Sequence, residues 1–383
     1  MTRSFPVQRT CPYAPPPEYR EFRAEAPLVK AGDLWLVTRH AEAQQVLVGT
    51  GISTDPSTPG HPGHGPADPE MEKFRIGQFI DLDPPEHTRL RKMLISEFSV
   101  RRIRDMRPHI QEIADGLIDA MAAAGSPADL VEAYGLALPS LVICELLGVP
   151  YADREFFQSR TRELVAGGGL GPAMEIRRFI DDLVTRAEKD PGDDLIGRLL
   201  QAEKVSHDEL VGMAFLLLVA GHETTANMIP LSALTLLRNP EQLDRLRQEP
   251  ELWPMAVDEL LRYHSIVDWV AFDRVATEDQ VIGGQLVRAG EGIYVLGASA
   301  NRDERAFPDP DVLDLRRGAR NHVAFGYGVH QCLGQNLARA ELEIALRTLF
   351  ERLPGLAVPV PDEELRFKYE GAIFGLFALP VTF

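Results

Sequence analysis

The chain has 383 residues, of which 45% are hydrophobic and 25% are charged. This length is enough for two average domains or for one large domain with a sizeable core. The formal net charge of −17 argues against a general nucleic-acid-binding protein, because phosphate binding depends on an excess of basic side chains.

The first residues and the three cysteines bear on the cellular compartment. The stretch MTRSFPVQRTCPYAPPPEY contains no apolar run, and the longest apolar run, near 210–221, is shorter than the about 20 residues that a membrane span requires. Cys11, Cys144 and Cys332 are widely separated and form no disulfide framework. We therefore expect a cytoplasmic protein with neither a signal peptide nor a membrane anchor.

Helical periodicity dominates the chain. In chain order, a strand is predicted at 34–38, an irregular loop rich in Gly and Pro at 51–70, and helices at 86–98, 105–124, 132–148, 151–166, 173–188, 206–237, 240–248, 253–264 and 335–352. Residues 280–297 are predicted to form a hairpin that turns at Ala289–Gly290, and 369–383 to end the chain as strand. The pattern indicates a helix-rich α+β protein.

The predicted helix 206–237 has a marked start and a weak middle. Ser206 and Glu209 form a capping-box pattern. In AGHETT, residues 220–225, glycine and threonine are poor helix formers, and a threonine hydroxyl can bond the carbonyl four residues back. We expect a loosened turn there with room for a water molecule, and a second break at Pro230.

An acid and an alcohol, Glu223 and Thr224, are adjacent at this weak turn. The residues alone leave two interpretations open. Either the pair takes part in chemistry inside a buried helix, or Glu223 is one exposed charge on a long helix and Thr224 is incidental.

A second pair, Glu259 and Arg262, is spaced by three residues on the predicted helix 253–264. This spacing places the carboxylate and the guanidinium on one face, where they can form a bidentate pair. Such pairs are common on helix surfaces, so the pair carries little meaning by itself.

The stretch FGYGVHQCLG, residues 325–334, places Cys332 in a glycine-rich loop just before a predicted helix. Four uses of this cysteine are considered: a buried filler, half of a disulfide, a nucleophile, or a metal ligand. The wide separation of the three cysteines makes the disulfide the weakest of the four.

The spacing Phe-Gly-x-Gly-x-His-x-Cys-x-Gly resembles the cysteine-loop signature of the cytochromes P450. Three other stretches resemble motifs of the same family in the same order. DPPEHTRLRKMLISEFS (83–99) is similar to the helix that carries ligands of the haem carboxylates, AGHETT to the oxygen-activating segment, and ELLR (259–262) to the paired Glu-x-x-Arg. The resemblance covers nearly the whole chain and is closest to soluble actinobacterial enzymes that take electrons from a ferredoxin.

The resemblance implies a mainly α (α+β) cytochrome P450 fold. It implies one helix-rich domain over 1–383 with small β-sheets, and haem b between the long central helix and the helix that follows the cysteine loop. Cys332 is then the iron ligand, as a thiolate that pushes electron density toward oxygen. Glycines in the loop let backbone N–H groups approach the sulfur, and the positive end of the following helix also favours a thiolate.

By the same resemblance, further residues receive roles around the haem. Phe325 packs beside the sulfur, Gly334 completes the loop, and Ala220 lies against the haem. The cations implied for the two haem carboxylates are His87, Arg91, Arg274 and His330. The residues implied for a structural ion network before the cysteine loop are Glu259, Arg262 and Arg317.

The resemblance assigns catalysis to Glu223 and Thr224, which match the acid–alcohol pair that supplies protons to dioxygen. It also implies an apolar pocket under the 51–80 loop and the short segment 162–176. The residues assigned to this pocket are Leu216, Val219, Val267, Val270, Phe272 and Phe374. A hydrophobic substrate of natural-product type follows.

The expected reaction is monooxygenation, as hydroxylation or epoxidation, in natural-product biosynthesis or xenobiotic oxidation. The expected partners are O2, a ferredoxin and its ferredoxin reductase, with no nucleic acid and no membrane, and the chain is expected to be a monomer. Cations that could meet an acidic ferredoxin are Arg89, Arg91, Lys92, Arg101, Arg102 and Arg104. Two alternatives are a haem-thiolate protein without oxygenation and a peroxide-driven hydroxylase, and the retained Glu223–Thr224 pair disfavours both.

Overall fold

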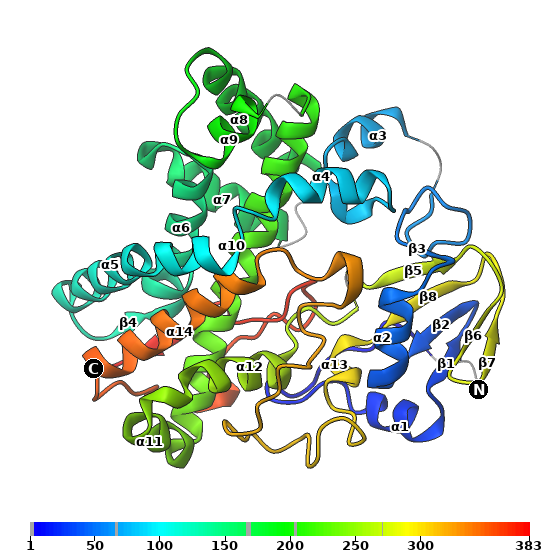
Figure 1. Cartoon of the computed structure of the whole chain (residues 1–383). Coiled ribbons are helices and arrows are strands. Elements are labelled where there is room, and N and C mark those ends of the chain that lie inside the picture. Colours follow the sequence, from blue (N-terminus) through cyan, green and yellow to red (C-terminus); the bar gives the residue numbers. More distant parts are fainter. Residues whose placement is uncertain (1–3, 66–67, 166–169, 203–204, 270) are drawn as a thin grey trace. The chain divides into compact units, whose positions relative to one another are not determined.

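The structure is a computed structural model, and it describes residues 4–65, 68–165, 170–202, 205–269 and 271–383. The chain divides into two compact units (Figure 1). Unit 1 comprises 1–67, 80–88 and 239–335, and unit 2 comprises 68–79, 89–238 and 336–383. The single domain expected over 1–383 stays a prediction.

Unit 1 is built on a five-stranded sheet in the order β1-β2-β8-β5-β3. The strands are β1 (Leu28–Ala31), β2 (Leu34–Val37), β3 (Ile52–Ser53), β5 (Asp273–Ala276) and β8 (Gly292–Val295). Strands β2 and β8 are parallel, with Leu36 opposite Tyr294, and the other neighbours are antiparallel. Figure 1 shows α1 (Glu18–Glu25) and α2 (His40–Val48) beside this sheet.

The apolar faces of these elements form the core of unit 1. Buried Val37, Val46, Ile293 and Val295 belong to one hydrophobic cluster of sheet and helix residues. The remaining elements of the unit are η4 (Pro250–Leu252), η5 (Gly328–His330), α11 (Pro240–Gln248), α12 (Trp253–His264) and α13 (Gly297–Ala300). The predicted strand at 34–38 and the predicted helices at 240–248 and 253–264 are confirmed.

The structure contains a hairpin within 280–297, but the turn predicted for it at Ala289–Gly290 is wrong. Strand β6 (Gln280–Ile282) pairs with β7 (Gln285–Val287) around Gly283 and Gly284. These glycines have φ of 54° and 79°, and a two-residue hairpin turn of type I′ requires positive φ at both positions. Gly290, with φ 82°, instead leads the chain into β8, which pairs with β2 and β5.

Unit 2 is mainly helical and is arranged around α10 (His207–Arg238). Its other elements are α3 (Pro69–Arg75), α5 (Val100–Ala124), the π-helical turn η2 (Val131–Gly135), α6 (Ala137–Leu147), η3 (Tyr151–Asp153), α7 (Arg154–Val165), α8 (Leu170–Lys189), α9 (Leu195–Gln201), η6 (Asp362–Glu364), and strands β4 (Ala128–Asp129) and β9 (Pro380–Val381). Three elements straddle the boundary: η1 (Phe79–Asp81), α4 (Glu86–Leu94) and α14 (Gln335–Arg352). Among the described residues, no helix is long and apolar enough to span a bilayer.

The long helix confirms one expectation and corrects another. Ser206 N–H donates to Glu209 Oε2 at 2.9 Å and Glu209 N–H donates to Ser206 Oγ at 3.4 Å, so the capping box is present. Helix α10 nevertheless runs without interruption through 220–225 and Pro230. Packing of neighbouring helices on a largely buried helix outweighs these weak local propensities.

Candidate active site

The cysteine loop of unit 1 closes on itself and presents Cys332. The Cys332 N–H donates to the Phe325 carbonyl at 2.8 Å, and the Gln331 N–H donates to the Gly328 carbonyl at 3.1 Å. Cys332 is exposed at the end of this loop, three residues before α14 begins. A buried-filler role for Cys332 is therefore excluded in this structure.

Two glycines of this loop are required by its backbone. Gly326 and Gly328 have φ of 68° and 72°, which L side chains rarely adopt. A Cβ at Gly328 would also lie 2.5 Å from the Leu47 carbonyl oxygen on α2. Gly334 differs, because no described atom lies within 4 Å of its would-be Cβ, so protein packing does not explain a glycine there.

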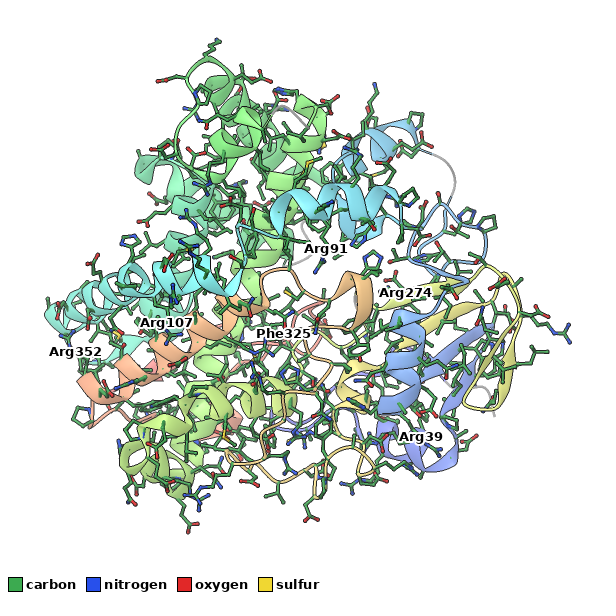
Figure 2. The ribbon with its side chains drawn as sticks, in the orientation of Figure 1. Arg39, Arg91, Arg107, Arg274, Phe325 and Arg352 are labelled. Carbon is green, nitrogen blue, oxygen red and sulfur yellow. The ribbon has the colours of Figure 1, made fainter. Side chains whose placement is uncertain are left out.

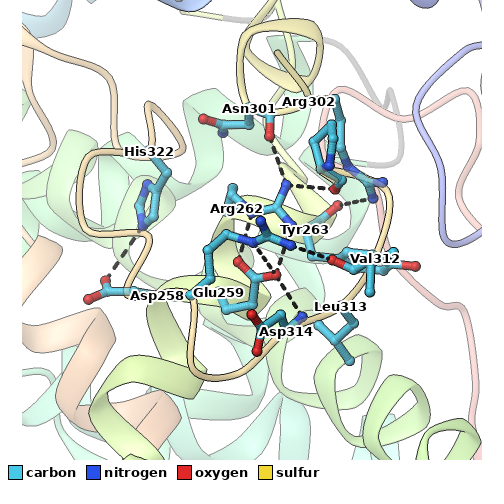
Figure 3. Close-up of polar contacts among 12 residues, drawn as sticks. Asp258, Glu259, Arg262, Tyr263, Asn301, Arg302, Val312, Leu313, Asp314 and His322 are labelled. Carbon is cyan, nitrogen blue, oxygen red and sulfur yellow. Dashed lines mark hydrogen bonds and ion pairs between the residues drawn. The ribbon is translucent and has the colours of Figure 1, made fainter. Parts of the chain in front are cut away.

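A buried ion network on α12 holds the segment that precedes the cysteine loop (Figure 3). Arg262 donates from Nε and Nη2 to the two oxygens of Glu259 at 2.7 and 2.8 Å. Arg262 Nη1 also donates to the Asn301 and Pro310 carbonyls at 2.8 and 2.9 Å. Arg317 Nε donates to Glu259 Oε1 at 3.2 Å, so the three predicted members of the network lie together.

Two further contacts link this network to the loop. The Asn301 side-chain oxygen accepts from the Val323 N–H at 2.8 Å. His322 lies 3.5 Å from Asp258 of α12 through Nε2, and its ring contacts the Phe325 ring with centroids 5.6 Å apart (Figure 3). Helix α12 is therefore linked to His322 directly through Asp258, and to Val323 through Arg262 and Asn301.

Three of the predicted carboxylate ligands belong to unit 1. The ring centroids of His87 and His330 are 4.1 Å apart, and His87 is buried. Arg274 lies on β5 (Figure 2) and is only 4% exposed. Burial lowers the pKa of Arg274, although the charges of Asp273, Asp83 and Asp81 oppose the decrease. A buried cation in this position favours an anionic partner.

The fourth predicted ligand, Arg91, lies one helical turn after His87 on α4 and is half-buried (Figure 2). The other cations of this segment differ in accessibility. Arg89 is paired with Glu209, the capping-box acid of α10. Arg101, Arg102 and Arg104 are exposed at the start of α5.

In unit 2, one stripe in the middle of α10 is left uncovered, although most of the helix is buried. Leu216, Ala220 and Thr224 are spaced by four residues and share a face, and all three retain exposure. Val219 on the edge of this stripe is half-buried. The Thr224 hydroxyl donates to the Ala220 carbonyl at 3.0 Å, so its oxygen can still accept a hydrogen bond from water.

Glu223 is 2% exposed, so its interpretation as an exposed surface charge is wrong. Its Oε1 accepts from Asn227 Nδ2 at 3.0 Å and from Lys368 Nζ at 3.3 Å. Its Oε2 is buried and accepts no hydrogen bond from the part of the chain that the structure describes; His222 Nδ1 lies 3.9 Å away.

The predicted pocket residues outside α10 are placed as follows. Val267 is partly buried against the core cluster that contains Phe272. The Phe272 ring abuts Gly326 and Gly297, so Phe272 occupies a core position. Phe374 is 4% exposed and stacks on Phe367 with centroids 6.0 Å apart. Val270 lies outside the described residues.

Comparison with known proteins identifies the family. A family model described as Cytochrome P450 matches residues 153–373. Pentalenic acid synthase from Streptomyces avermitilis is 49% identical over 392 residues, which cover 99% of this chain and 97% of that protein. The chain belongs to the cytochrome P450 family.

Solved cytochromes P450 confirm the predicted fold. The crystal structure of mycinamicin VIII C21 methyl hydroxylase from Micromonospora griseorubida, bound to mycinamicin VIII, matches with a TM-score of 0.92 at 45% identity and covers 99% of each chain. Cytochrome P450 MoxA from Nonomuraea recticatena matches with a TM-score of 0.91 at 47% identity, over 100% of this chain and 98% of that one. The predicted monooxygenase class is likewise confirmed, and the cytochrome P450 family implies a haem-iron cofactor, O2, a small-molecule substrate and a redox partner.

The residues present fit the haem of a cytochrome P450. Unit 1 contributes an exposed thiol on a glycine loop, an open side at Gly334, a pair of adjacent histidines, and the buried Arg274. Taken by itself, unit 2 presents the uncovered stripe of α10, which includes the apolar Leu216 and Ala220. The haem of a cytochrome P450 is a flat apolar group with an iron centre and two carboxylates. It requires a thiolate for the iron, cations for the carboxylates and apolar side chains for its faces.

Several residues of this cytochrome P450 site were missed from the sequence. Asn227 lies four residues after Glu223 on one helix, so its spacing could have indicated the contact. Lys368 is 145 positions from Glu223, and Asn301 is 39 from Arg262, so no local pattern indicates them.

Proposed function

We propose that this cytochrome P450 contains haem b and inserts one oxygen atom from O2 into a hydrophobic natural product, by hydroxylation or epoxidation, with electrons from a ferredoxin. The observation that carries the proposal is Cys332, exposed on a loop whose backbone requires Gly326 and Gly328. The relatives named pentalenic acid synthase and mycinamicin VIII C21 methyl hydroxylase support the natural-product class.

In this proposal Cys332 would ligate the iron as a thiolate. When bound, the haem supplies the activation of dioxygen, which no side chain provides. The loop hydrogen bond from Cys332 N–H to Phe325 keeps the sulfur at the loop tip, and the α12 network limits movement of the segment before it. His87, Arg91, Arg274 and His330 would hold the haem carboxylates, since charge-assisted hydrogen bonds to a carboxylate are the strong ones.

Glu223 and Thr224 would handle protons. The Thr224 hydroxyl donates to the Ala220 carbonyl, so its oxygen is available to hold a water on the uncovered stripe of α10. Glu223 has one oxygen anchored by two donors and a second, Oε2, that accepts no hydrogen bond from a described residue. That second oxygen is the atom at which a proton could be held and passed on.

The substrate would lie on the same apolar stripe. Leu216 and Val219 present hydrocarbon beside Ala220, and Phe374 belongs to an aromatic group at the end of the chain. Apolar side chains with few polar groups are typical of sites for hydrophobic small molecules.

A ferredoxin would bind the start of α5. Arg101, Arg102 and Arg104 are exposed there, and the residues Val100 at the start of the helix and Ile95 before it are 71% and 54% exposed. A basic patch with apolar contacts on an acidic protein suits an acidic partner, because complementary charge steers the encounter.

The test is turnover with heavy-isotope-labelled dioxygen. The purified haem-loaded protein, a ferredoxin, its reductase and a panel of hydrophobic natural products that includes mycinamicin VIII should yield a product that carries one labelled oxygen atom per molecule. A product without label, or turnover with hydrogen peroxide but not with the electron chain, would contradict the proposal and favour one of the two alternative classes.

A further inference from the structure

Lys368 makes an ion pair with the acid of the proposed acid–alcohol pair. Its Nζ lies 3.3 Å from Glu223 Oε1 and 3.0 Å from Asn227 Oδ1. Asn227 Nδ2 in turn donates to Glu223 Oε1 at 3.0 Å. All three residues belong to unit 2, and they form a closed triangle of charge-assisted hydrogen bonds.

The three side chains differ in their access to water. Glu223 and Asn227 are each 2% exposed. The Lys368 side chain is 19% exposed, so it is more accessible to solvent than the acid that it binds. A carboxylate that is buried without a cation pays a large desolvation penalty, and Lys368 offsets this penalty for Glu223.

The triangle acts on one oxygen of the acid only. Both donors, Asn227 and Lys368, bind Oε1. Oε2 is buried and accepts no hydrogen bond from the described part of the chain. Lys368 therefore fixes the orientation of the carboxylate and leaves one oxygen available.

Lys368 also connects the acid with the predicted pocket. The Lys368 N–H donates to the Gly375 carbonyl at 2.8 Å, and Phe367 and Leu376 form the adjacent bridge, so residues 366–377 form a hairpin-like turn. Phe374 lies in this turn. A Cβ at Gly375 would lie 1.8 Å from Asn227 Oδ1, so only glycine allows the turn to approach α10 this closely.

We propose that Lys368 is the positioning residue for Glu223: it keeps the buried carboxylate charged and oriented for proton transfer, and it couples that orientation to the turn that carries Phe374. The proposal rests on the proposed monooxygenase function for its kinetic consequences. Its structural part concerns the resting protein and does not depend on turnover.

The decisive comparison uses the haem-loaded protein with Lys368→Met, Lys368→Arg and Arg366→Met. Arg366→Met is the matched control, because it removes a cation from the same turn; Arg366 lies over the exposed Phe377 ring at 5.2 Å and makes no described contact with Glu223. Substrate affinity, read from the iron spin state, should stay within about twofold of wild type in all three variants.

The first readout is infrared spectroscopy of the resting protein. Lys368→Met should show a carboxyl band of a protonated acid at neutral pH, because a buried carboxylate without its cation takes up a proton. The band should be absent from Lys368→Arg, from Arg366→Met and from the double variant Lys368→Met with Glu223→Gln. A Lys368→Met spectrum identical to that of Arg366→Met would overturn the proposal, even if the enzyme oxidises no compound tested.

The second readout is turnover. Lys368→Met should lower kcat by at least about tenfold with little change in KM, and it should enlarge the solvent deuterium isotope effect on kcat, because proton supply becomes limiting. Lys368→Arg should recover most of kcat. Wild-type kcat and isotope effect in Lys368→Met, alongside normal product formation by the wild type, would reject the role of Lys368 while the proposed function stands.

Discussion

Glu259 and Arg262 lie one turn apart on α12 and are joined by two parallel hydrogen bonds of 2.7 and 2.8 Å, with both side chains fully buried. The guanidinium uses its remaining Nη1 group on the Asn301 and Pro310 carbonyls. Removing the guanidinium would leave a buried carboxylate and two carbonyls without these donors. The Glu259–Arg262 pair therefore holds α12 against the segment before the cysteine loop.

Arg262→Lys tests this attachment. The variant should lower the free energy of unfolding by about 3 kcal/mol or more, because one ammonium cannot replace the planar guanidinium fork of a buried pair. It should also lower the haem content. Denaturant unfolding and haem quantification measure the two effects. The control is Arg238→Lys, because Arg238 forms a partly exposed ion pair with Asp362. This control should lower the free energy of unfolding by less than about 1 kcal/mol. Equal losses of unfolding free energy in the two variants would contradict a structural role for the buried pair.

Cys332→Ala tests the proposed iron ligand. The reduced carbon monoxide complex of the wild type should show the red-shifted Soret band of thiolate ligation, and the variant should lose it. Cys11→Ala and Cys144→Ser should keep the band, since neither residue lies in the cysteine loop. A wild-type spectrum typical of histidine ligation would remove the basis of the proposed function.

Thr224→Ala and Glu223→Gln should differ in their effects. Loss of the Thr224 hydroxyl should leave electron consumption largely intact and lower the yield of product per electron, because no hydroxyl orders water on the α10 stripe. Loss of the Glu223 acid should instead slow turnover by about tenfold or more, because proton supply becomes limiting. Electron uptake and product formed, measured together, separate the two; a normal yield per electron in Thr224→Ala would place the proton route elsewhere.

Reversal of Arg101, Arg102 and Arg104 to Glu tests the ferredoxin surface. Reduction by ferredoxin should slow by about tenfold or more at low salt and by less at high salt, since exposed charges are screened beyond about 10 Å at 0.1 M. Stopped-flow reduction at several salt concentrations measures this. Reversing three exposed arginines elsewhere, Arg178, Arg247 and Arg288, changes the net charge equally and should have a smaller effect. Equal slowing of ferredoxin reduction in the two triple variants would indicate that the net charge of the protein, and not a docking site at α5, controls the rate.

Glu341 on α14 provides a pH-dependent stability test. Burial raises the pKa of this carboxyl to about 8 from 4.5, although a hydrogen bond from Thr225 opposes the rise. Between these pH values the folded protein keeps a proton that the unfolded chain releases. The stabilisation from this group is therefore complete below pH 4.5 and is lost as pH rises toward 8, by at most about 1.4 kcal/mol for each pH unit.

Glu341→Gln, which cannot titrate, should show a flatter dependence of the unfolding free energy on pH between 5 and 8. Glu351→Gln, on the exposed part of the same helix, should keep the wild-type slope. Denaturant titrations across this pH range give the measurement. Parallel slopes for Glu341→Gln and the wild type would show that Glu341 does not hold a proton in the folded protein.

The sequence alone determined features that depend on neighbours in the chain. The capping box of Ser206 and Glu209, the Glu259–Arg262 pair and the bounds of α11, α12 and α14 follow from spacings of three or four residues, which helical geometry converts directly into contacts. The cysteine loop was recognisable for the same reason, because its glycines and Cys332 lie within ten residues.

Only the tertiary structure decided contacts between distant segments. Glu223 was ambiguous in the sequence because a helix position does not reveal which neighbours cover it; burial and Lys368, 145 residues away, make it an anchored acid. The hairpin turn at Gly283–Gly284 and the parallel pairing of β2 with β8 depend in the same way on which strands meet in the sheet. Local spacing sets which side chains share a face, whereas packing across the fold sets what that face contacts and how strongly its charges are held.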